Sequence, residues 1–309
     1  MKKDKRDKAR KWTDKHLEEM VRRLNEIYST AEFEMQEKWE EYMQEVAQNL
    51  DALREAAESP GATPEMITRY QTALQEATLR NEYFRNMIDS YVFHLAHVND
   101  YAVQYLNKEM PKIYTVNYNH MYTLLEPYKA RFGISFTLVN EHTVKRMIEN
   151  KEIKLYKTRV DIPKDMRWNR KNINSQMLQG ILQGESIPKI AARLQNVTDM
   201  NYNAAVRNAR TMTTYAENLG RQDSMIESAK LGIVAKREWS AVHDSRVRAW
   251  HLELDGQLRD VDEPFENSVG KIRFPGDIEA APENRYNCRC GMGSKIVGFR
   301  NSDGTIEYV

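Results

Sequence analysis

The chain has 309 residues, 29% of them charged, and a mean hydropathy of −0.74, which leaves room for two domains but argues against a single thick core. Its 46 basic residues nearly balance 45 acidic ones, so the net charge of +1 excludes a general polyanion-binding protein and makes any nucleic-acid contact local. No apolar run reaches the roughly 20 residues of a membrane span and no secretory signal opens the chain, so we expect folding in a reducing cytoplasm without membrane contact.

The first 130 residues (1–130) are expected to form a long helical hairpin, or stalk, preceded by a basic arm. The arm, 1–11, is rich in lysine and arginine, and it either contacts phosphates or an acidic partner or is a solvated terminus. Apolar residues recur at three- and four-residue steps over 11–58 and over 63–105, which predicts two amphipathic helices. Because the Ser59-Pro60-Gly61 break between them is short, the helices should pair antiparallel.

Residues 131–230 are expected to form a mixed connector followed by a second helical group. Already at Pro111 the pattern becomes less regular, although Tyr114, Tyr118, Tyr122 and Leu125 still indicate helix up to Pro127. The stretches 132–134 and 136–139 are typical of short strands. A short helix is expected over 140–150 and an extended segment over 151–165. Three further helices follow: one over 172–183, one that begins at Ser186 with Pro188 in its first turn, and one over 201–230.

A basic cluster in this region is a candidate for nonspecific contact with double-stranded DNA. Cations beside an exposed aromatic ring are typical of nucleic-acid contacts, although any lysine-rich loop has a similar composition. The candidate residues are Lys154, Lys157, Arg167, Trp168, Arg170 and Lys171. We expect such contact to be an accessory role.

The C-terminal segment 231–309 contains both cysteines and many turn signals. A strand is expected over 233–242, after which Asp255-Gly256, Pro264, Pro275-Gly276 and Pro282 exclude a long helix. The segment should therefore be a small, loop-rich α+β domain, and the whole chain should be mainly α with this domain at its C-terminus. Such a small unit usually needs an additional source of stability, for example a disulfide, a bound metal ion or docking onto a larger structure.

Cys288 and Cys290 are the natural candidates to provide this additional stability. A single intervening residue strains a mutual disulfide, so a metal ion or plain burial remains. Thiolates and imidazoles suit zinc, and His251, with His243 as a candidate fourth ligand, would complete a tetrahedral structural site, although the spacing is not that of a standard zinc finger. In the alternative, the cysteines are small buried hydrophobes and His251 hydrogen-bonds Asp244 or Asp255.

Six short motifs follow one another in this part of the chain. In order they are Trp239; Asp244-x-Arg246-Val247-Arg248-x-x-His251; Leu254-Asp255-Gly256-Gln257; Asp262-Glu263-Pro264-Phe265; Pro275-Gly276-Asp277; and Asn287-Cys288-Arg289-Cys290. The series resembles the C-terminal domain of the Mu-F-like phage head morphogenesis family, the minor head proteins of tailed phages. Upstream, Arg210-Thr211 and Asn218-Leu219-Gly220-Arg221 are similar to the helix that precedes this domain in the family, with Met212 where a glutamate is often found.

The resemblance implies a virion protein of the head interior or portal vertex, present in the host cytoplasm during assembly. Its implied partner is the portal protein, with scaffold and capsid proteins as further candidates, and its implied roles are procapsid assembly and DNA packaging or ejection. In such a protein Arg210 would clamp the C-terminal domain, and the charged motif residues would form an internal network. The motif residues given a structural role are Asp244, Arg246, Arg248, Asp255, Gly256 and Asn287.

An enzyme or a metal-stabilised nucleic-acid-binding module is the alternative function. Both would be centred on His251 and Cys288/Cys290, and a metal-dependent hydrolase would also use Asp244 or Asp255. The sequence contains no H-E-x-x-H, P-loop or nucleophile-elbow signature. We therefore expect a structural and interaction protein rather than an enzyme.

Overall fold

The computed structural model describes residues 7–133 and 136–309, so the first six positions of the basic arm lie outside the described residues. The chain forms two compact units built from segments that are distant in sequence. The first contains the segment ending at Val21, Tyr105–Thr158 and Val206–Val309; the second contains Arg22–Gln104 and Arg159–Ala205. The two units do not coincide with the three consecutive segments expected from the sequence, because long helices contribute residues to both units.

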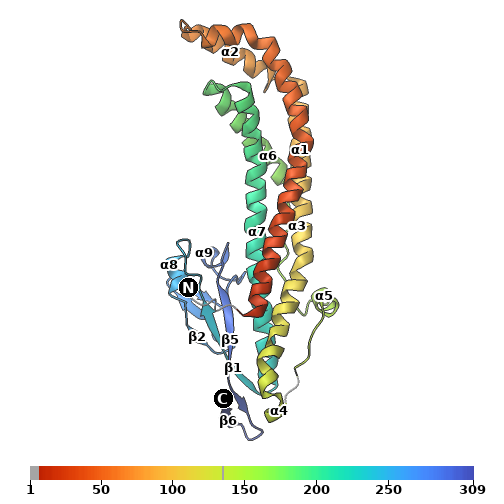
Figure 1. Ribbon diagram of the computed structural model, residues 1–309, viewed down its shortest axis with the longest axis vertical. Helices are drawn as coiled ribbons and strands as arrows, with labels where there is room; N and C mark the ends of the chain where they lie inside the picture. Colours follow the sequence, from red (N-terminus) through yellow and green to blue (C-terminus); the bar gives the residue numbers. More distant parts are fainter. Residues whose placement is uncertain (1–6, 134–135) are drawn as a thin grey trace. The chain divides into compact units, whose positions relative to one another are not determined.

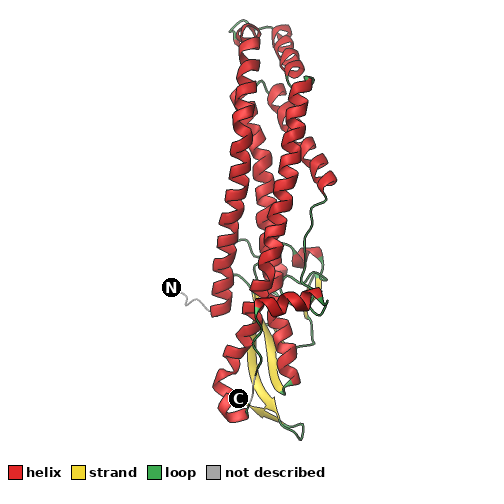
Figure 2. Cartoon of the chain, turned by 90° about the vertical axis from the view of Figure 1, so that its right-hand side faces the viewer, coloured by secondary structure: helices red, strands yellow, loops and turns green. Residues whose placement is uncertain are grey.

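Long helices dominate the chain, as the sequence predicts (Figures 1 and 2). They are α1 Lys8–Glu58, α2 Pro64–Ala77, α3 Glu82–Leu125, α6 Ile162–Leu182 and α7 Ile187–Lys230, and the shorter ones are η1 Glu126–Tyr128, α4 Lys129–Phe132 and α5 Glu141–Glu149. The mainly α fold class with long N-terminal helices is confirmed, and the short helix expected over 140–150 is α5.

In the second unit, α1 and α3 pack against each other through buried aromatic rings. Trp39 of α1 meets Phe84 and Tyr91 of α3 edge to face, at ring-centroid distances of 5.1 and 6.1 Å. Further along the same pair, the Tyr28 hydroxyl donates to Asn99 Oδ1 over 2.6 Å. Residue numbers rise along one helix as they fall along the other, so the expected antiparallel hairpin is confirmed.

The helix expected over 63–105 is two helices, α2 and α3, with a break between them. Thr78 ends α2, since its hydroxyl donates to the carbonyl of Leu74 at 2.6 Å. Asn81 begins α3, since its Oδ1 accepts from the backbone N–H of Phe84 at 3.2 Å. Polar side chains that compete with the helix ladder therefore divide a stretch whose apolar periodicity is continuous.

Three other sequence expectations about the middle of the chain are wrong. The region after Pro111 is not less regular, because Pro111 lies inside α3, and this helix continues to Leu125, close to the helix end expected at Pro127. The two helices expected after Ser186 are the single helix α7, because the sequence between them contains neither glycine nor proline. Residues 136–139 are not a strand: Asn119 of α3 bonds both the N–H and the carbonyl of Val139, at 3.0 and 2.7 Å, in place of a neighbouring strand.

In the first unit, the C-terminal part of the chain forms a small antiparallel sheet in the order β2-β1-β5-β6 beside a β3-β4 hairpin. The strands are β1 Ile233–Ser240, β2 Leu258–Arg259, β3 Phe265–Asn267, β4 Gly270–Ile272, β5 Gly291–Arg300 and β6 Ile306–Tyr308, with short helices α8 Ala249–Leu252 and α9 Pro282–Arg285. The expected small α+β domain is confirmed. Its central pair, β1 and β5, carries alternating buried and exposed side chains along β1, as expected of a sheet with one face on a core.

Candidate functional site

One face of α7 holds the turn that contains both cysteines. The Thr214 hydroxyl donates to the carbonyl of Cys288 at 2.8 Å, and Asn218 Oδ1 accepts from the backbone N–H of Met292 at 2.9 Å. One turn earlier on the helix, Thr211 Oγ1 accepts from the N–H of Asn287 at 3.0 Å. These helix residues are spaced by three and four, so a single face of α7 satisfies successive backbone groups of the turn.

Arg221 extends this face and is almost completely buried. Its guanidinium donates to both carboxylate oxygens of Asp7 at 2.7 and 2.9 Å, to Asn117 Oδ1 at 3.0 Å and to the carbonyl of Met292 at 3.2 Å. Burial of Asp7 acts to raise its pKa, but the hydrogen bonds and charge of Arg221 outweigh it and hold that pKa well below the usual range. Arg221 therefore joins the residue that precedes α1, the helix α3 and the strand β5 at one buried point.

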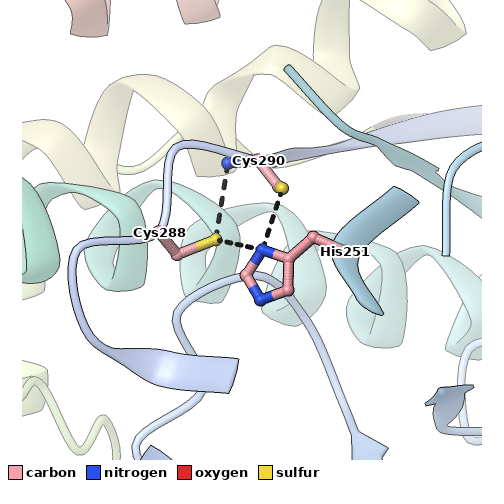
Figure 3. Close-up of side chains that lie close together, drawn as sticks. All are labelled: His251, Cys288 and Cys290. Atoms are coloured by element: carbon pink, nitrogen blue, oxygen red, sulfur yellow. Dashed lines mark hydrogen bonds between the residues drawn. The ribbon is translucent and has the colours of Figure 1, made fainter. Parts of the chain in front are cut away.

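His251, Cys288 and Cys290 lie together beside this turn, as the sequence predicts (Figure 3). The Nδ1 atom of His251 is 3.7 Å from the Sγ of Cys288 and 3.4 Å from the Sγ of Cys290. The three side chains are only 1–3% exposed. Both cysteines are free thiols, so neither a disulfide nor solvent satisfies these groups.

Local backbone geometry brings the three side chains to one point. His251 lies on the short helix α8, and the cysteines follow α9 at the start of β5. Asn287 turns the chain between α9 and the first cysteine with a positive φ of 54°, a conformation that asparagine tolerates better than most residues. Arg210 of α7 donates to Asn287 Oδ1 at 2.9 Å, which is the clamp on the C-terminal domain expected from the sequence.

The two thiols hold their protons unequally. The hydrogen bond to Cys290, together with burial, raises the pKa of Cys288 well above its usual value. The hydrogen bond from Cys288 lowers the pKa of Cys290 to about 5, and His251 acts in the same direction against the effect of burial. The pair thus favours one thiolate next to the imidazole.

His243 lies outside this cluster. Its side chain is 68% exposed, and its Nε2 is 2.9 Å from Asp255 Oδ2. Asp255 also accepts from the N–H of Ala241 at 2.7 Å, so it fixes the chain that leaves β1. The proposed contact of His251 with Asp244 or Asp255 is wrong, because both carboxylates have other partners and Nδ1 of His251 faces the two sulfurs.

The charged motif residues do not form one internal network. Asp244 accepts two hydrogen bonds from Arg289, one of them 2.7 Å long, and this pairing holds the pKa of Asp244 well below its usual range. The backbone N–H of Arg246 donates to Asp244 Oδ1 at 2.9 Å, but its guanidinium lies 3.9 Å from that carboxylate. Arg248 donates to the carbonyl of Tyr286 at 2.7 Å. The partner of Asp244 is thus Arg289, a residue of the Asn-Cys-Arg-Cys motif.

Gly256 has the turn role expected of it. Its φ is 75°, which favours glycine, and its N–H donates to the carbonyl of Trp239 at 2.9 Å. The carbonyl of Gln257 accepts from the Trp239 N–H at 3.1 Å, so the Asp-Gly turn pairs with the end of β1. The Trp239 ring, fully buried, packs edge to face on Phe265 at 5.3 Å.

A cavity of about 90 Å³ adjoins the cluster of His251 and the cysteines. Its wall includes all three of those residues and four arginines, Arg210, Arg246, Arg248 and Arg289, but no carboxylate among the described lining residues. Burial, followed by the charges of Arg289 and Arg246, lowers the pKa of Arg210. The cavity wall therefore combines arginine guanidinium groups with the two thiols and the imidazole.

A second buried arginine, Arg237 of β1, was not predicted from the sequence. It is 1% exposed and donates to three backbone carbonyls, among them Arg273 at 2.6 Å and Asp260 at 2.8 Å, while burial lowers its pKa to about 10. Arg237 thereby fixes the loops on either side of the β3-β4 hairpin. The only sequence signal was a charged residue at an inward position of an alternating strand.

The candidate DNA-contact residues fall in both units. Lys154 and Lys157 are exposed on the extended segment before α6 in the first unit. In the second, Trp168 on α6 is 44% exposed, and Arg170 is paired with Asp89 at 2.8 Å. Arg167 and Lys171 are exposed on the same helix. Within the described ranges, no helix combines the length and apolar character that crossing a membrane requires.

Comparisons with known proteins found a matching protein family and two similar proteins. Residues 171–292 match the family described as Phage Mu protein F like protein. The chain is similar to minor head protein GP7 of Bacillus phage SPP1, with 29% identity over 220 residues, 67% of this chain and 69% of that protein. It is also similar to NAD(+)--arginine ADP-ribosyltransferase EFV of Enterococcus faecalis, with 29% identity over 188 residues, 59% of this chain and 37% of that protein. No solved structure matches significantly.

Proposed function

We propose that this chain, in which residues 171–292 match the Mu-F-like family, is a minor head protein that docks on the portal and supports procapsid assembly and DNA packaging or ejection. The observation that carries the proposal is the extent of the family match. Residues 171–292 include α7, the cluster of His251 and the cysteines, and the first residues of β5 that α7 holds. The matched region thus coincides with the helix-and-turn assembly that organises the C-terminal domain.

The second unit supplies a surface suited to protein docking. Phe93, His97 and Tyr101 follow one another at four-residue steps on α3, and all three are exposed. Phe93 and Tyr101 are 53% and 54% exposed, and the rings of Phe93 and His97 lie 4.1 Å apart. Exposed aromatic stripes on a helix are typical of protein interfaces, so we assign this stripe to contact with the portal.

Nonspecific contact with packaged DNA is an accessory part of the same proposal. The cations of α6 surround the exposed Trp168, but Arg170 is already paired with Asp89, which leaves Arg167 and Lys171 as the stronger contributors. Phosphate contacts release counterions, so affinity for duplex DNA should fall steeply with salt and should weaken in a variant in which both residues are glutamine. Salt-insensitive binding would exclude this role.

The geometry supports binding rather than catalysis. A metal-dependent hydrolase needs a general base near the ion, but no carboxylate lines the cavity among the described residues, and Asp244 is held by Arg289. The activity in the name of the ADP-ribosyltransferase belongs to that protein, of which the alignment covers 37%. We therefore assign this chain a role in assembly.

Co-purification with the portal protein of the same phage tests the proposal. The full-length chain should form a stable complex with the portal, and a Phe93→Ala/Tyr101→Ala variant should bind it at least tenfold more weakly. Tyr308→Ala, which removes an aromatic ring that is 71% exposed in β6, is the matched control and should bind normally. A wild-type chain that does not bind the portal would contradict the docking role, and unchanged binding by the double variant would exclude this stripe.

A further inference from the structure

We propose that His251, Cys288 and Cys290 bind one zinc ion, and that the fourth ligand of the ion is an oxygen of a phosphate group held in the arginine-lined cavity. The proposal rests on the geometry of the first unit alone and is independent of the head role.

The distances between the ligand atoms fit a tetrahedral ion. Zinc lies about 2.3 Å from thiolate sulfur and about 2.0–2.1 Å from imidazole nitrogen, so tetrahedral angles place sulfur and nitrogen roughly 3.5 Å apart. The two observed separations are 3.7 Å from Cys288 and 3.4 Å from Cys290, and all three ligand atoms lie within 4.8 Å of one another. An ion therefore fits between them without movement of the backbone.

Hydrogen bonds alone satisfy this cluster poorly. Nδ1 of His251 has one lone pair or one proton, yet both sulfurs approach it within hydrogen-bonding distance. Nε2 of the same ring is buried without a hydrogen-bond partner among the described residues. A metal ion resolves the conflict at Nδ1, because it accepts the Nδ1 lone pair and both sulfur lone pairs at once. The ring proton then lies on Nε2, which keeps no partner among the described residues.

The surroundings of Cys288 are those of a thiolate ligand. The backbone N–H of Cys290 points at the Sγ of Cys288 from 3.4 Å, a contact that stabilises negative charge on the sulfur. Two thiolates and an imidazole favour zinc over magnesium or calcium, which prefer oxygen ligands. Burial of all three residues also protects the thiolates from oxidation.

The fourth coordination position opens into the cavity. All three ligand residues contribute to its wall, whereas His243, the candidate fourth ligand, is turned toward Asp255 at 2.9 Å. A zinc site with three protein ligands and an open position binds a water or a ligand from solution as its fourth ligand.

The cavity wall specifies the charge of that ligand. A divalent ion with two thiolates is neutral, so the arginine charges of the wall remain. Arg289 is matched by Asp244, whereas Arg248 bonds a backbone carbonyl and Arg210 bonds the neutral amide of Asn287. Guanidinium groups grouped in this way bind oxyanions, and phosphate is the tetrahedral oxyanion that best matches their paired donors.

Metal content tests the first part of the proposal. The full-length protein, purified under reducing conditions, should contain one zinc per chain by elemental analysis, and cobalt substitution should give the absorption of a tetrahedral thiolate site. Cys290→Ser and His251→Ala should lose the metal, while His243→Ala should keep it. Because the absorption is recorded after cobalt has been added, it reports whether the site forms even in a variant that folds poorly without metal. A wild-type protein that binds neither zinc nor cobalt, or a His251→Ala variant that binds both normally, would overturn the site.

Spectral titration of the cobalt-loaded protein tests the second part. Inorganic phosphate, or a short DNA duplex with terminal phosphates, should shift the visible cobalt absorption, which identifies whether free phosphate or a DNA end reaches the ion. Arg210→Gln should keep the metal but weaken the phosphate response at least tenfold. Arg300→Gln, an exposed arginine on β5, should leave it unchanged. A spectrum insensitive to both probes, or a full response in Arg210→Gln, would overturn the oxyanion ligand.

Discussion

The hydroxyl of Thr214, in the middle of α7, donates a hydrogen bond to the backbone carbonyl of Cys288 at 2.8 Å. This contact joins a long helix to the turn that carries both cysteines. With Thr211, Asn218 and Arg221 on the same face, it makes α7 the support on which the C-terminal domain is built. The Mu-F-like match includes both partners, since it runs from residue 171 to residue 292.

Thr214→Val should destabilise the domain by about 1 kcal/mol, because the carbonyl of Cys288 loses its hydrogen bond while the side-chain shape is kept. The neighbouring Thr213 is an internal control. Its Oγ1 is buried without a hydrogen-bond partner among the described residues, so Thr213→Val should be neutral or stabilising. Hydrogen exchange of the β5 amides measures both effects. Equal hydrogen-exchange protection of β5 in the two variants would show that the hydrogen bond to the carbonyl of Cys288 contributes nothing to the stability of the domain.

Arg221→Met should cost about 3 kcal/mol or more, because it leaves the Asp7 carboxylate and Asn117 without their buried partner. Arg207→Met, at an exposed position of the same helix, should change stability by less than about 0.5 kcal/mol. Urea unfolding followed by circular dichroism gives both values. A small effect for Arg221→Met would mean that its ion pair with Asp7 is not needed for stability.

Asp223→Asn should stabilise the protein near neutral pH. Burial raises the pKa of Asp223 to about 6, against the opposing hydrogen bond from Tyr114, so the folded state binds this proton more tightly than the unfolded state. The favourable contribution of the protonated carboxyl is complete below about pH 4 and is lost as the pH rises through about 6. Ionised Asp223 then costs up to about 3 kcal/mol, which asparagine avoids while still accepting from Tyr114.

Unfolding free energies of wild type and Asp223→Asn, measured across this range, check the sign. The variant should gain stability relative to wild type as the pH rises from about 4 to about 7, and the two should converge at the acid end. Other titrating groups are common to both proteins and cancel in the difference. A difference that does not depend on pH would contradict the raised pKa of Asp223.

Gly220→Ala should destabilise the first unit although alanine is the better helix former. A Cβ at this position would lie 2.6 Å from the carbonyl oxygen of Tyr114 and 3.1 Å from the N–H nitrogen of Tyr118, and backbone atoms cannot move aside as a side chain can. The overpacking should cost roughly 2 kcal/mol, more than the ~1 kcal/mol of helix propensity gained. At Gly293 the nearest atoms are 3.8 Å away, so Gly293→Ala should be tolerated. Melting temperatures of the two variants give the comparison, and equal values would rule out close packing of α3 on α7.

The helices and the cluster of His251, Cys288 and Cys290 were predicted from the sequence because both leave local signals. Apolar periodicity marks α1, and the chemistry of two thiols and an imidazole singles out the cluster. Helix ends were less predictable. The break at Thr78 depends on side-chain competition, which the continuous apolar periodicity does not reveal.

The charge pairs could not be predicted because they join residues far apart in sequence. Asp244 could pair with any nearby arginine, and only the fold selects Arg289 over Arg246. Arg221 likewise carries no local signal that its partner is Asp7, 214 positions earlier in the chain. A buried arginine is recognisable from the sequence only as a charge on an apolar face, and that pattern does not identify its partner.

The most direct test of the head role is the amount of this protein in procapsids purified from infected cells with and without a functional portal gene. Quantitative mass spectrometry of particles of equal capsid content gives the amount. We expect the protein at a fixed ratio to the portal in normal procapsids and its loss from particles that lack the portal. The same amount in both kinds of particle, or none in either, would contradict docking on the portal.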